Sequence, residues 1–320
     1  MVETEMGTAI APMTSMHTTI KKSMLIVFVS AATLAGCQKV VTSPPPPPAP
    51  PPPPPPPRSL FNHVFIVVEE NTNYATAIGN SSMPYLNSLA EQYGLATQYY
   101  ADTHPSIGNY FMMTVGDTIT NNDDYSGPLV TEDNVVRELL KAGKTWKSYA
   151  EDLPHVGYTG PDVGNYARRH NTVALLADVA GDSTQVKNLV PFSQFATDLA
   201  NNSLPNYAFI VPNLCDDAHD CALSTADSWL QRNIDPLIKS AQFQRDGVLI
   251  ILFDESDSDN SHGGGRIPWV TVSAKAKRGF QSNTLYQHES TLRLSLDALG
   301  VRAFPNHAAS APDMTEFYQP

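Results

Sequence analysis

The sequence predicts an α/β fold with a mainly parallel central sheet and helices on both faces. Two runs, Val64–Val68 and Val248–Phe253, are apolar at every position, which is typical of strands buried on both sides of a parallel sheet. Segments with helical spacing of apolar residues alternate with these and other short apolar runs. No internal repeat or second linker follows residue 58, so we expect one domain over residues 58–320.

Two helices are predicted in the first half of this domain. Apolar residues recur at helical spacing over 83–94, and Gly94 is placed to cap the C-terminus of that helix. The next helix is expected to have Thr131 as its cap and to end at Gly143. The apolar run Tyr207–Val211 is predicted to be a strand.

The second half continues the alternation. A helix is expected over 224–242, and Pro236 inside it should kink or split it, because proline removes a backbone hydrogen bond. Trp269–Ser273 is a further predicted strand. The last helix is predicted over His288–Leu299 and should end at Gly300.

The composition is that of a folded, acidic protein. Apolar residues make up 42% and charged residues 16%, which excludes a wholly disordered chain of 320 residues. The net charge is −12, and because the first 57 residues carry +1, the remainder carries −13. Such a surface argues against nucleic acid and against a polybasic contact with anionic lipid. It can still bind a phosphate group if a metal cation supplies positive charge.

The first 37 residues are predicted to be a signal. Lys21 and Lys22 precede the apolar run Met24–Gly36, which has the length of a secretory signal and is too short to span a bilayer. Together with Cys37, the end of this run resembles a bacterial lipobox. That resemblance implies acylation of Cys37, export, and a lipid anchor in the outer membrane or at the cell surface. We expect membrane contact only through this lipid.

Residues 38–57 are predicted to be a linker. Thirteen of the fourteen residues from Pro44 to Pro57 are proline, so this stretch should form an extended polyproline II rod. At about 3.1 Å per residue it would reach roughly 43 Å. We interpret it as a spacer between the anchor and the domain.

Two cysteines remain if Cys37 is acylated. Cys215 and Cys221 lie six positions apart, and in an exported chain this spacing favours a disulfide that closes a small loop. Zinc binding is the alternative, although His219 is the one histidine between them.

Acidic side chains follow the two most apolar strands. The first strand is followed by Glu69, Glu70 and Asn71, and the second by Asp254 and Glu255. Because the carboxyl ends of parallel strands meet at one edge of a sheet, these carboxylates should repel each other unless a cation lies between them. Oxygen donors of this kind suit a divalent ion such as Mg²⁺, Ca²⁺ or Mn²⁺.

Ser106 is a candidate nucleophile. Pro105 disfavours helix before it, and Ser106 is a good N-cap for a helix that runs to Thr114. A hydroxyl at a helix N-terminus meets free N–H groups, which also suit a phosphate, and metal coordination would activate it further.

Five segments resemble, in order, the bacterial phosphoesterase family. They are HVFIVVEENTNY, THPSIGNYFMMTVGD, VPNLCDDAHDC, ILFDESD with Gly263–Gly265, and YQHESTLR. That family contains phospholipases C and acid phosphatases and has an alkaline-phosphatase-like α/β fold. The resemblance extends from about residue 61 to residue 318.

The resemblance implies one metal site and a serine nucleophile. The matching metal ligands are Glu70, Asn71, Asp254 and Glu255, and Ser106 matches the nucleophile that also ligates the metal. The chain lacks the histidine-rich ligand set of the two-zinc alkaline phosphatases. We therefore expect one divalent ion, which could be Mg, Ca, Mn or Zn.

Further site residues are carried over from the same motifs. Asn109 resembles the asparagine that contacts a phosphoryl oxygen, and His219 resembles a site histidine that could protonate the leaving alkoxide. His170 resembles a further site histidine, and Asp217 could orient one of these histidines or the metal.

Other polar residues are expected to be structural. Glu69 should point away from Glu70, His104 should fix the turn before Pro105, and His288 should bond to the backbone. His262 is assigned to a loop. The Gly263–Gly265 run is expected to be a tight turn near the metal-binding strand.

The predicted function is metal-dependent phosphoester hydrolysis through a serine nucleophile. The acidic surface and the lack of a separate lipid-binding domain favour an acid phosphatase-like enzyme, a monomer that acts on small phosphomonoesters. A phospholipase C-like phosphodiesterase is the alternative within the family. A non-catalytic binding module displayed on a stalk is the alternative from another class.

Overall fold

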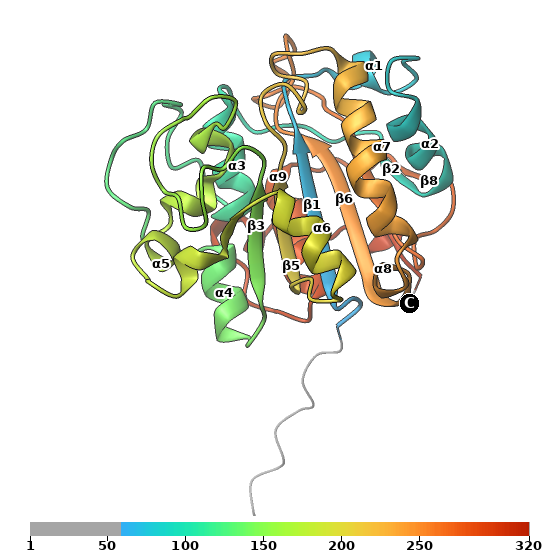
Figure 1. The fold of residues 1–320 in the computed structure, drawn as a ribbon. Helices are drawn as coiled ribbons and strands as arrows, with labels where there is room; N and C mark the ends of the chain where they lie inside the picture. Colours follow the sequence, from blue (N-terminus) through green and yellow to red (C-terminus); the bar gives the residue numbers. More distant parts are fainter. Residues whose placement is uncertain (1–58, 320) are drawn as a thin grey trace, which may run out of the picture. The chain divides into compact units, whose positions relative to one another are not determined.

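The computed structural model describes residues 59–319, so the predicted signal, Cys37 and the linker lie outside the described residues. Eight strands form a single sheet (Figure 1). The strands are β1 His63–Glu69, β2 Gly94–Ala96, β3 Trp146–Ala150, β4 Leu189–Pro191, β5 Tyr207–Val211, β6 Gly247–Phe253, β7 Trp269–Val272 and β8 Phe280–Ser282.

The sheet has the order β4-β3-β5-β1-β6-β7-β2-β8 and is mainly parallel, as predicted. β1 lies at its centre and pairs in parallel with β5 and β6, so that Val64 is opposite Tyr207 and Val248. β7 runs antiparallel to both of its neighbours. All residues of β6 and all but the first of β1 are buried, because helices cover both faces of the sheet.

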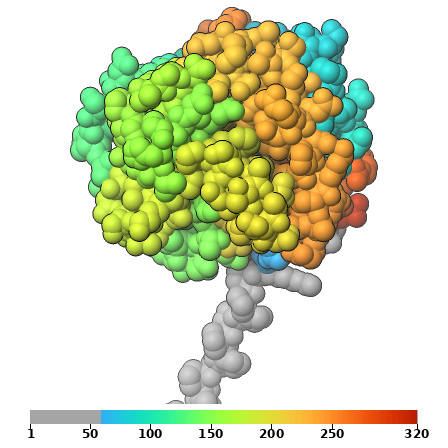
Figure 2. Space-filling view, in the orientation of Figure 1, coloured from blue at the N-terminus to red at the C-terminus, as the bar shows by residue number. Residues whose placement is uncertain are grey.

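The helices are divided between the two faces of the sheet. They are α1 Tyr74–Ala77, α2 Pro84–Gln92, α3 Ser106–Thr114, α4 Val135–Lys141, α5 Ala177–Ala180, α6 Ser193–Ala200, α7 Leu223–Lys239, α8 Ala241–Asp246 and α9 His288–Ala298. α6, α7 and α8 cover the near face in Figure 1, and α3 and α9 lie behind the sheet. Figure 2 shows the near face closed by the yellow and orange segments that contain α6 and α7.

Short 3-10 helices complete the described chain. They are η1 Arg168–His170, η2 Thr172–Leu175, η3 Gln185–Asn188, η4 Asn306–Ala309 and η5 Thr315–Phe317. Within residues 59–319, none of the helices has the length and apolar character needed to cross a bilayer.

Two predicted helix boundaries were wrong. Gly94 does not cap α2 but begins β2, where a Cβ atom would lie 2.7 Å from Thr271 Cγ2. The cap of α4 is Asn134 rather than Thr131, and its side chain accepts a hydrogen bond of 3.0 Å from the backbone N–H of Arg137. Capping therefore depends on where tertiary packing places the helix start, which local sequence did not reveal.

Pro236 neither ends nor splits its helix. It lies inside α7, which continues to Lys239. The break comes at Ser240, whose hydroxyl accepts a hydrogen bond from the backbone N–H of Phe243 and caps α8. The two predicted apolar strands and the last helix, with Gly300 at a φ of +78° just after it, are confirmed.

The carboxyl ends of the central strands bring the acidic loops together. The backbone N–H of Asp254, after β6, donates to the carbonyl of Glu69 at 3.0 Å. The backbone N–H of Glu70 donates to the carbonyl of Asp217, in the loop after β5, at 2.8 Å. Three loops that are distant in sequence therefore meet above β1.

Candidate active site

Ser106 is the first residue of α3 and does not cap it. The N-cap position belongs to Pro105, which forms no side-chain cap hydrogen bond, so the predicted capping role of Ser106 is wrong. Its hydroxyl instead lies 3.1 Å from Glu70 Oε2 and 3.1 Å from Glu255 Oε1. The side chain is buried and faces the acidic loops.

The turn before Ser106 is held by Asn109 and by the glycine run. The Asn109 side chain accepts hydrogen bonds from the backbone N–H groups of Asp102 and Thr103 and donates one to the carbonyl of Thr103. A Cβ atom on Gly264 would lie 2.4 Å from that carbonyl. Only glycine permits this close approach, which fits the tight turn predicted for Gly263–Gly265.

The five predicted metal ligands surround this turn. Glu70, Ser106 and Asp254 are 0–2% exposed, Glu255 is 5% exposed, and Asn71 is half-buried. Asn71 has a φ of +43°, which asparagine tolerates better than most residues, and its backbone N–H donates to Asp254 Oδ1 at 3.1 Å.

Two oxygen atoms of this ligand set have no protein partner. Asn71 Oδ1 and Asp254 Oδ2 are buried without a hydrogen bond among the described residues. Buried polar atoms are rarely left unpaired, so their presence here fits a site built for a cation. The donors are carboxylate, amide and hydroxyl oxygens, which suit a hard divalent ion.

The carboxyl groups of the site repel one another. Burial first, and then the neighbouring Asp254, raise the pKa of Glu70 well above its usual value. Burial and then Glu255 raise the pKa of Asp254 to about 7, and burial raises that of Glu255 to about 7. A bound cation would relieve this repulsion and restore the ionised forms.

A buried histidine lies on the other side of Glu70. His170 Nε2 is 3.3 Å from Glu70 Oε1, and His170 Nδ1 is 3.4 Å from Asp217 Oδ2. Burial, followed by the nearby Arg169, lowers the pKa of His170 well below its usual value. Ligand atoms of Glu70, His170 and Asp217 all lie within 4.8 Å of one another, which makes this group a possible metal-binding triad.

His219 is next to this triad and more exposed. Its ring centre lies 5.9 Å from that of His170, and its backbone N–H donates to Asp217 Oδ1 at 2.8 Å. The side chain is 27% exposed, and Nδ1 lies 2.7 Å from Asp220 Oδ1. The structure thus places both predicted histidines beside Asp217.

The loop that carries Asp217 and His219 is closed by a disulfide. Cys215 and Cys221 are bonded, with Cα atoms 4.7 Å apart. The disulfide that the sequence favours is therefore present, so these two cysteines do not bind zinc.

Sequence reasoning missed three neighbours of the site. The hydroxyl of Tyr110 donates to Glu70 Oε1 at 2.5 Å, and the ring of His104 contacts the Glu255 carboxylate. Asp123 Oδ1 accepts from the backbone N–H of Ile107 at 3.1 Å. This amide is therefore already bonded, although the sequence analysis expected free N–H groups at the start of α3. The side chain of Tyr110 follows Ser106 by one helical turn, and that spacing was the available signal.

His288 bonds to the backbone, as expected. Its Nε2 lies 2.6 Å from the carbonyl oxygen of Asp254, directly after β6. It thereby supports the backbone of a candidate ligand. Glu69 is buried without a hydrogen bond to its carboxylate among the described residues, and it is not part of the ligand set.

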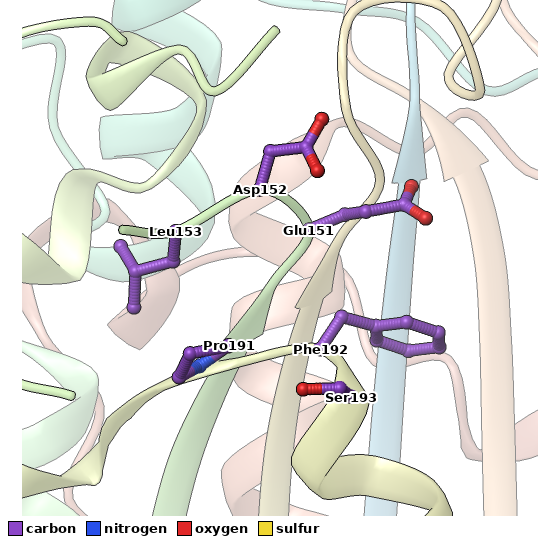
Figure 3. A pocket seen from close by; sticks show the side chains of 6 residues that line it. All are labelled: Glu151, Asp152, Leu153, Pro191, Phe192 and Ser193. Atoms are coloured by element: carbon purple, nitrogen blue, oxygen red, sulfur yellow. The ribbon is translucent and has the colours of Figure 1, made fainter. Parts of the chain in front are cut away.

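A cavity of about 380 Å³ lies beside the candidate site rather than in it. It is lined by Glu151, Asp152 and Leu153 after β3, and by Pro191, Phe192 and Ser193 where β4 ends and α6 begins. Figure 3 shows the carboxylates of Glu151 and Asp152 pointing away from Pro191 toward the carboxyl end of the strands. None of the candidate catalytic or metal-ligating residues lines this cavity.

Comparison of sequences identifies relatives of this chain. The family model described as the Phosphoesterase family matches residues 80–301. The chain is 33% identical over 261 residues to the phosphatidylinositol-3-phosphatase of Mycobacterium tuberculosis, covering 81% of this chain and 83% of that protein. It is 33% identical over 247 residues to an acid phosphatase of Aspergillus fumigatus, covering 72% of this chain. The aligned part spans 53% of that fungal protein, about half its length.

Comparison of structures identifies the same kind of fold. A protein in the alkaline phosphatase superfamily from Vibrio parahaemolyticus superposes with a TM-score of 0.54 over 83% of this chain and 74% of that chain, at 14% identity. The phosphonate monoester hydrolase of Silicibacter pomeroyi gives a TM-score of 0.55 over 80% of this chain and 76% of its own, at 12% identity. These similarities establish an alkaline-phosphatase-like fold. Together with the family match, they show that the chain belongs to the Phosphoesterase family and is a phosphoric ester hydrolase.

Proposed function

We propose that the protein is a metal-dependent phosphatase that uses Ser106 as its nucleophile. The observation that carries this proposal is the position of the Ser106 hydroxyl, 3.1 Å from both Glu70 and Glu255 instead of in a capping position. A buried serine between two carboxylates is poised to lose its proton.

The ligands of the ion would be Glu70, Asn71, Ser106, Asp254 and Glu255. Two of their oxygen atoms, Asn71 Oδ1 and Asp254 Oδ2, are buried without a hydrogen bond within residues 59–319. When bound, a divalent ion supplies Lewis-acid chemistry by polarising the phosphoryl group and stabilising an alkoxide.

In the first half-reaction, the Ser106 oxygen attacks phosphorus as its proton passes to a carboxylate of Glu70 or Glu255. The bond between phosphorus and the alcohol oxygen breaks, and His219 donates a proton to the leaving alcohol. A phosphoserine remains. In the second half-reaction, a water molecule attacks phosphorus and gives a proton to His219. The bond between phosphorus and the Ser106 oxygen breaks, Ser106 regains the proton held by the carboxylate, and free phosphate leaves.

We propose a phosphomonoester as the substrate. Relatives of this chain are named phosphatidylinositol-3-phosphatase and acid phosphatase, and both names describe removal of a phosphate group. The site also lies among buried acidic residues, which suits a small phosphate held through a cation better than a large anionic surface.

A substrate panel tests this proposal. The full chain is assayed with p-nitrophenyl phosphate and with p-nitrophenyl phosphocholine, each with and without EDTA. We expect turnover of the monoester that EDTA abolishes and added divalent metal restores. Turnover of the diester alone would identify a phospholipase C-like enzyme, and no turnover of either would favour a binding module.

We also propose that the enzyme is exported and anchored by a lipid on Cys37. The disulfide of the domain supports an oxidising compartment. Metabolic labelling with a radioactive fatty acid tests this, because Cys37→Ala should remove the label. Label that persists in this variant would contradict the proposal.

A further inference from the structure

A smaller cavity, of about 280 Å³, lies beside the start of α3. Two loops line it with the side chains of Asp123, Asp124, Ser126, Pro161, Asp162 and Arg168. Asp123 connects the cavity to the candidate site, because its Oδ1 accepts a hydrogen bond of 3.1 Å from the backbone N–H of Ile107. Ile107 directly follows Ser106, so the cavity borders the first turn of the helix that carries the proposed nucleophile.

The same cavity borders η1, the short helix that carries His170. Arg168 is the first residue of η1 and lines the cavity, whereas His170 is the last residue and its Nε2 lies 3.3 Å from Glu70 Oε1. The Ser106 hydroxyl approaches the other oxygen of Glu70, at 3.1 Å. The cavity is therefore next to the two elements that meet at Glu70, where the alcohol part of a phosphate ester would have to lie.

The charges around the cavity are only partly compensated. Arg169 serves two of the three carboxylates, because its Nη1 lies 3.1 Å from Asp162 Oδ2 and its Nε lies 4.0 Å from Asp123 Oδ2. The carboxylate of Asp124 and the guanidinium of Arg168 form no ion pair among the described residues. The cavity therefore presents one uncompensated negative charge and one uncompensated positive charge.

This pair of charges favours hydroxyl groups as ligands. A second phosphate on the substrate would be repelled by Asp124, and an ammonium group would be repelled by Arg168. A hydroxyl group can donate to a carboxylate and accept from a guanidinium, so neighbouring hydroxyls can satisfy both side chains. Arg168 uses Nη2 to donate to the carbonyl of Tyr125, and a guanidinium has five N–H groups in total. Pro161 is the one apolar residue of the lining, so an apolar alcohol would bury little apolar surface there.

We propose that this cavity binds the alcohol part of the substrate and that this alcohol is a small polyol such as a monosaccharide. The inference rests on the proposed function and narrows the substrate from phosphomonoesters in general to phosphorylated polyols. The volume suits a small alcohol, since pockets for drug-sized ligands measure about 300–1,000 Å³. Asp124 and Arg168 are the residues that determine this specificity, and they take no part in the proton transfers.

A matched pair of substrates tests the proposal. Glucose 6-phosphate and cyclohexylmethyl phosphate both carry a six-membered ring on a CH₂–O–phosphate group, but only the sugar ring has hydroxyl groups. The value of kcat/KM is measured for both with the full chain, in the divalent ion that supports hydrolysis of p-nitrophenyl phosphate. We expect the wild type to prefer glucose 6-phosphate by about tenfold or more, since hydrogen bonds to charged groups discriminate by about that factor.

Two variants assign this preference to the cavity. Asp124→Ala and Arg168→Gln should each lower the preference by about tenfold and change turnover of cyclohexylmethyl phosphate by no more than about twofold. Glu132→Ala is the matched control, because Glu132 is an exposed acidic residue of the same segment that does not line the cavity. It should keep the wild-type preference. Circular dichroism and melting temperature show whether each variant is folded.

Binding to Ser106→Ala gives a second readout that needs no turnover. Isothermal titration compares the Kd values of the two phosphates for Ser106→Ala and for the double variant with Asp124→Ala. We expect tighter binding of glucose 6-phosphate than of cyclohexylmethyl phosphate in the first protein and equal binding in the second.

The outcomes separate this inference from the proposed function. If the wild type hydrolyses p-nitrophenyl phosphate but does not prefer glucose 6-phosphate, or if Asp124→Ala and Arg168→Gln keep the preference, the polyol site is refuted and the proposed function stands. If the wild type hydrolyses no phosphomonoester while Ser106→Ala binds glucose 6-phosphate in a way that depends on Asp124, the polyol site stands and the proposed function fails. If there is neither turnover nor preferential binding, both are refuted.

Discussion

The hydroxyl of Ser106 lies 3.1 Å from Oε2 of Glu70, although 36 positions separate the two residues along the chain. Glu70 follows the central strand β1, and Ser106 begins α3, a helix behind the sheet (Figure 1). The fold thus places a potential nucleophile against a carboxylate that belongs to the candidate metal site.

Replacing Ser106 by alanine should abolish turnover and leave the domain folded. Loss of the attacking oxygen is expected to lower kcat by about 10³-fold or more. The free energy of unfolding should change by no more than about 2 kcal/mol, because only hydrogen bonds within the site are lost. Ser295→Ala, at a buried serine bonded to the carbonyl of Thr291, is the matched control and should retain activity. Substantial activity in Ser106→Ala would refute the nucleophile assignment.

Removal of divalent ions should lower both activity and thermal stability. A ligand that binds only the folded state stabilises it by about 2.7 kcal/mol at a concentration one hundred times its dissociation constant. Scanning fluorimetry with EDTA and with added metal measures the shift in Tm. Asp254→Asn removes a ligand of the proposed ion, so added metal should no longer raise the Tm of this variant. An unchanged Tm in metal-free wild-type protein would contradict the site.

Replacing His219 by glutamine should affect poor leaving groups most. A general acid contributes about 10²–10⁴-fold when the leaving alkoxide needs a proton. We therefore expect a large loss of kcat/KM with an alkyl phosphate and a small one with p-nitrophenyl phosphate. His155→Gln, at an exposed histidine bonded to the carbonyl of Val156, is the control. Equal losses with both substrates would exclude proton donation by His219.

Breaking the Cys215–Cys221 disulfide should reduce activity more than its stability effect explains. The chain-entropy model gives about 2 kcal/mol for a loop of this size. The loop carries Asp217 and His219, so the double serine variant should lower kcat by loosening these residues. Activity is measured at a temperature where circular dichroism shows the variant folded. Wild-type kcat in that variant would show that the disulfide does not position the site.

A buried ion pair away from the site should make stability depend on pH. Asp198 is 5% exposed, and Lys147 Nζ lies 2.5 Å from its Oδ2. Burial would raise the pKa of Asp198, but hydrogen bonds from Lys147, Tyr149 and Gln194 outweigh burial and lower it. Its contribution is therefore complete above the unfolded pKa of about 3.9 and is lost as the pH falls through the lower folded value.

Asp198→Asn should thus destabilise the protein at pH 7 and do so less near pH 3. The free energies of unfolding of variant and wild type are compared in denaturant at both values. The pair Lys239–Asp235, whose side chains are 73% and 28% exposed, provides the control, since Asp235→Asn should have little effect at either pH. An equal cost of Asp198→Asn at pH 7 and pH 3 would contradict the lowered pKa.

Local patterns were sufficient for the core of the fold. The runs Val64–Val68 and Val248–Phe253 are apolar throughout, and only a strand covered on both faces buries every side chain of such a run. The short strands β2 and β8 were not predicted, because three residues carry too little periodicity. The N-cap of α4 was also predicted wrongly, because the helix starts after Asn134 and not after Thr131.

The sequence by itself determined the chemistry available at the carboxyl ends of β1 and β6, because acidic residues directly follow the strands that must lie at the centre of the sheet. Only the tertiary structure decided that Ser106 faces Glu70 instead of capping α3, and that His170 lies between Glu70 and Asp217. The physical reason is that side-chain direction depends on how separate loops pack against one another, and no local pattern encodes the position of a residue 100 places away.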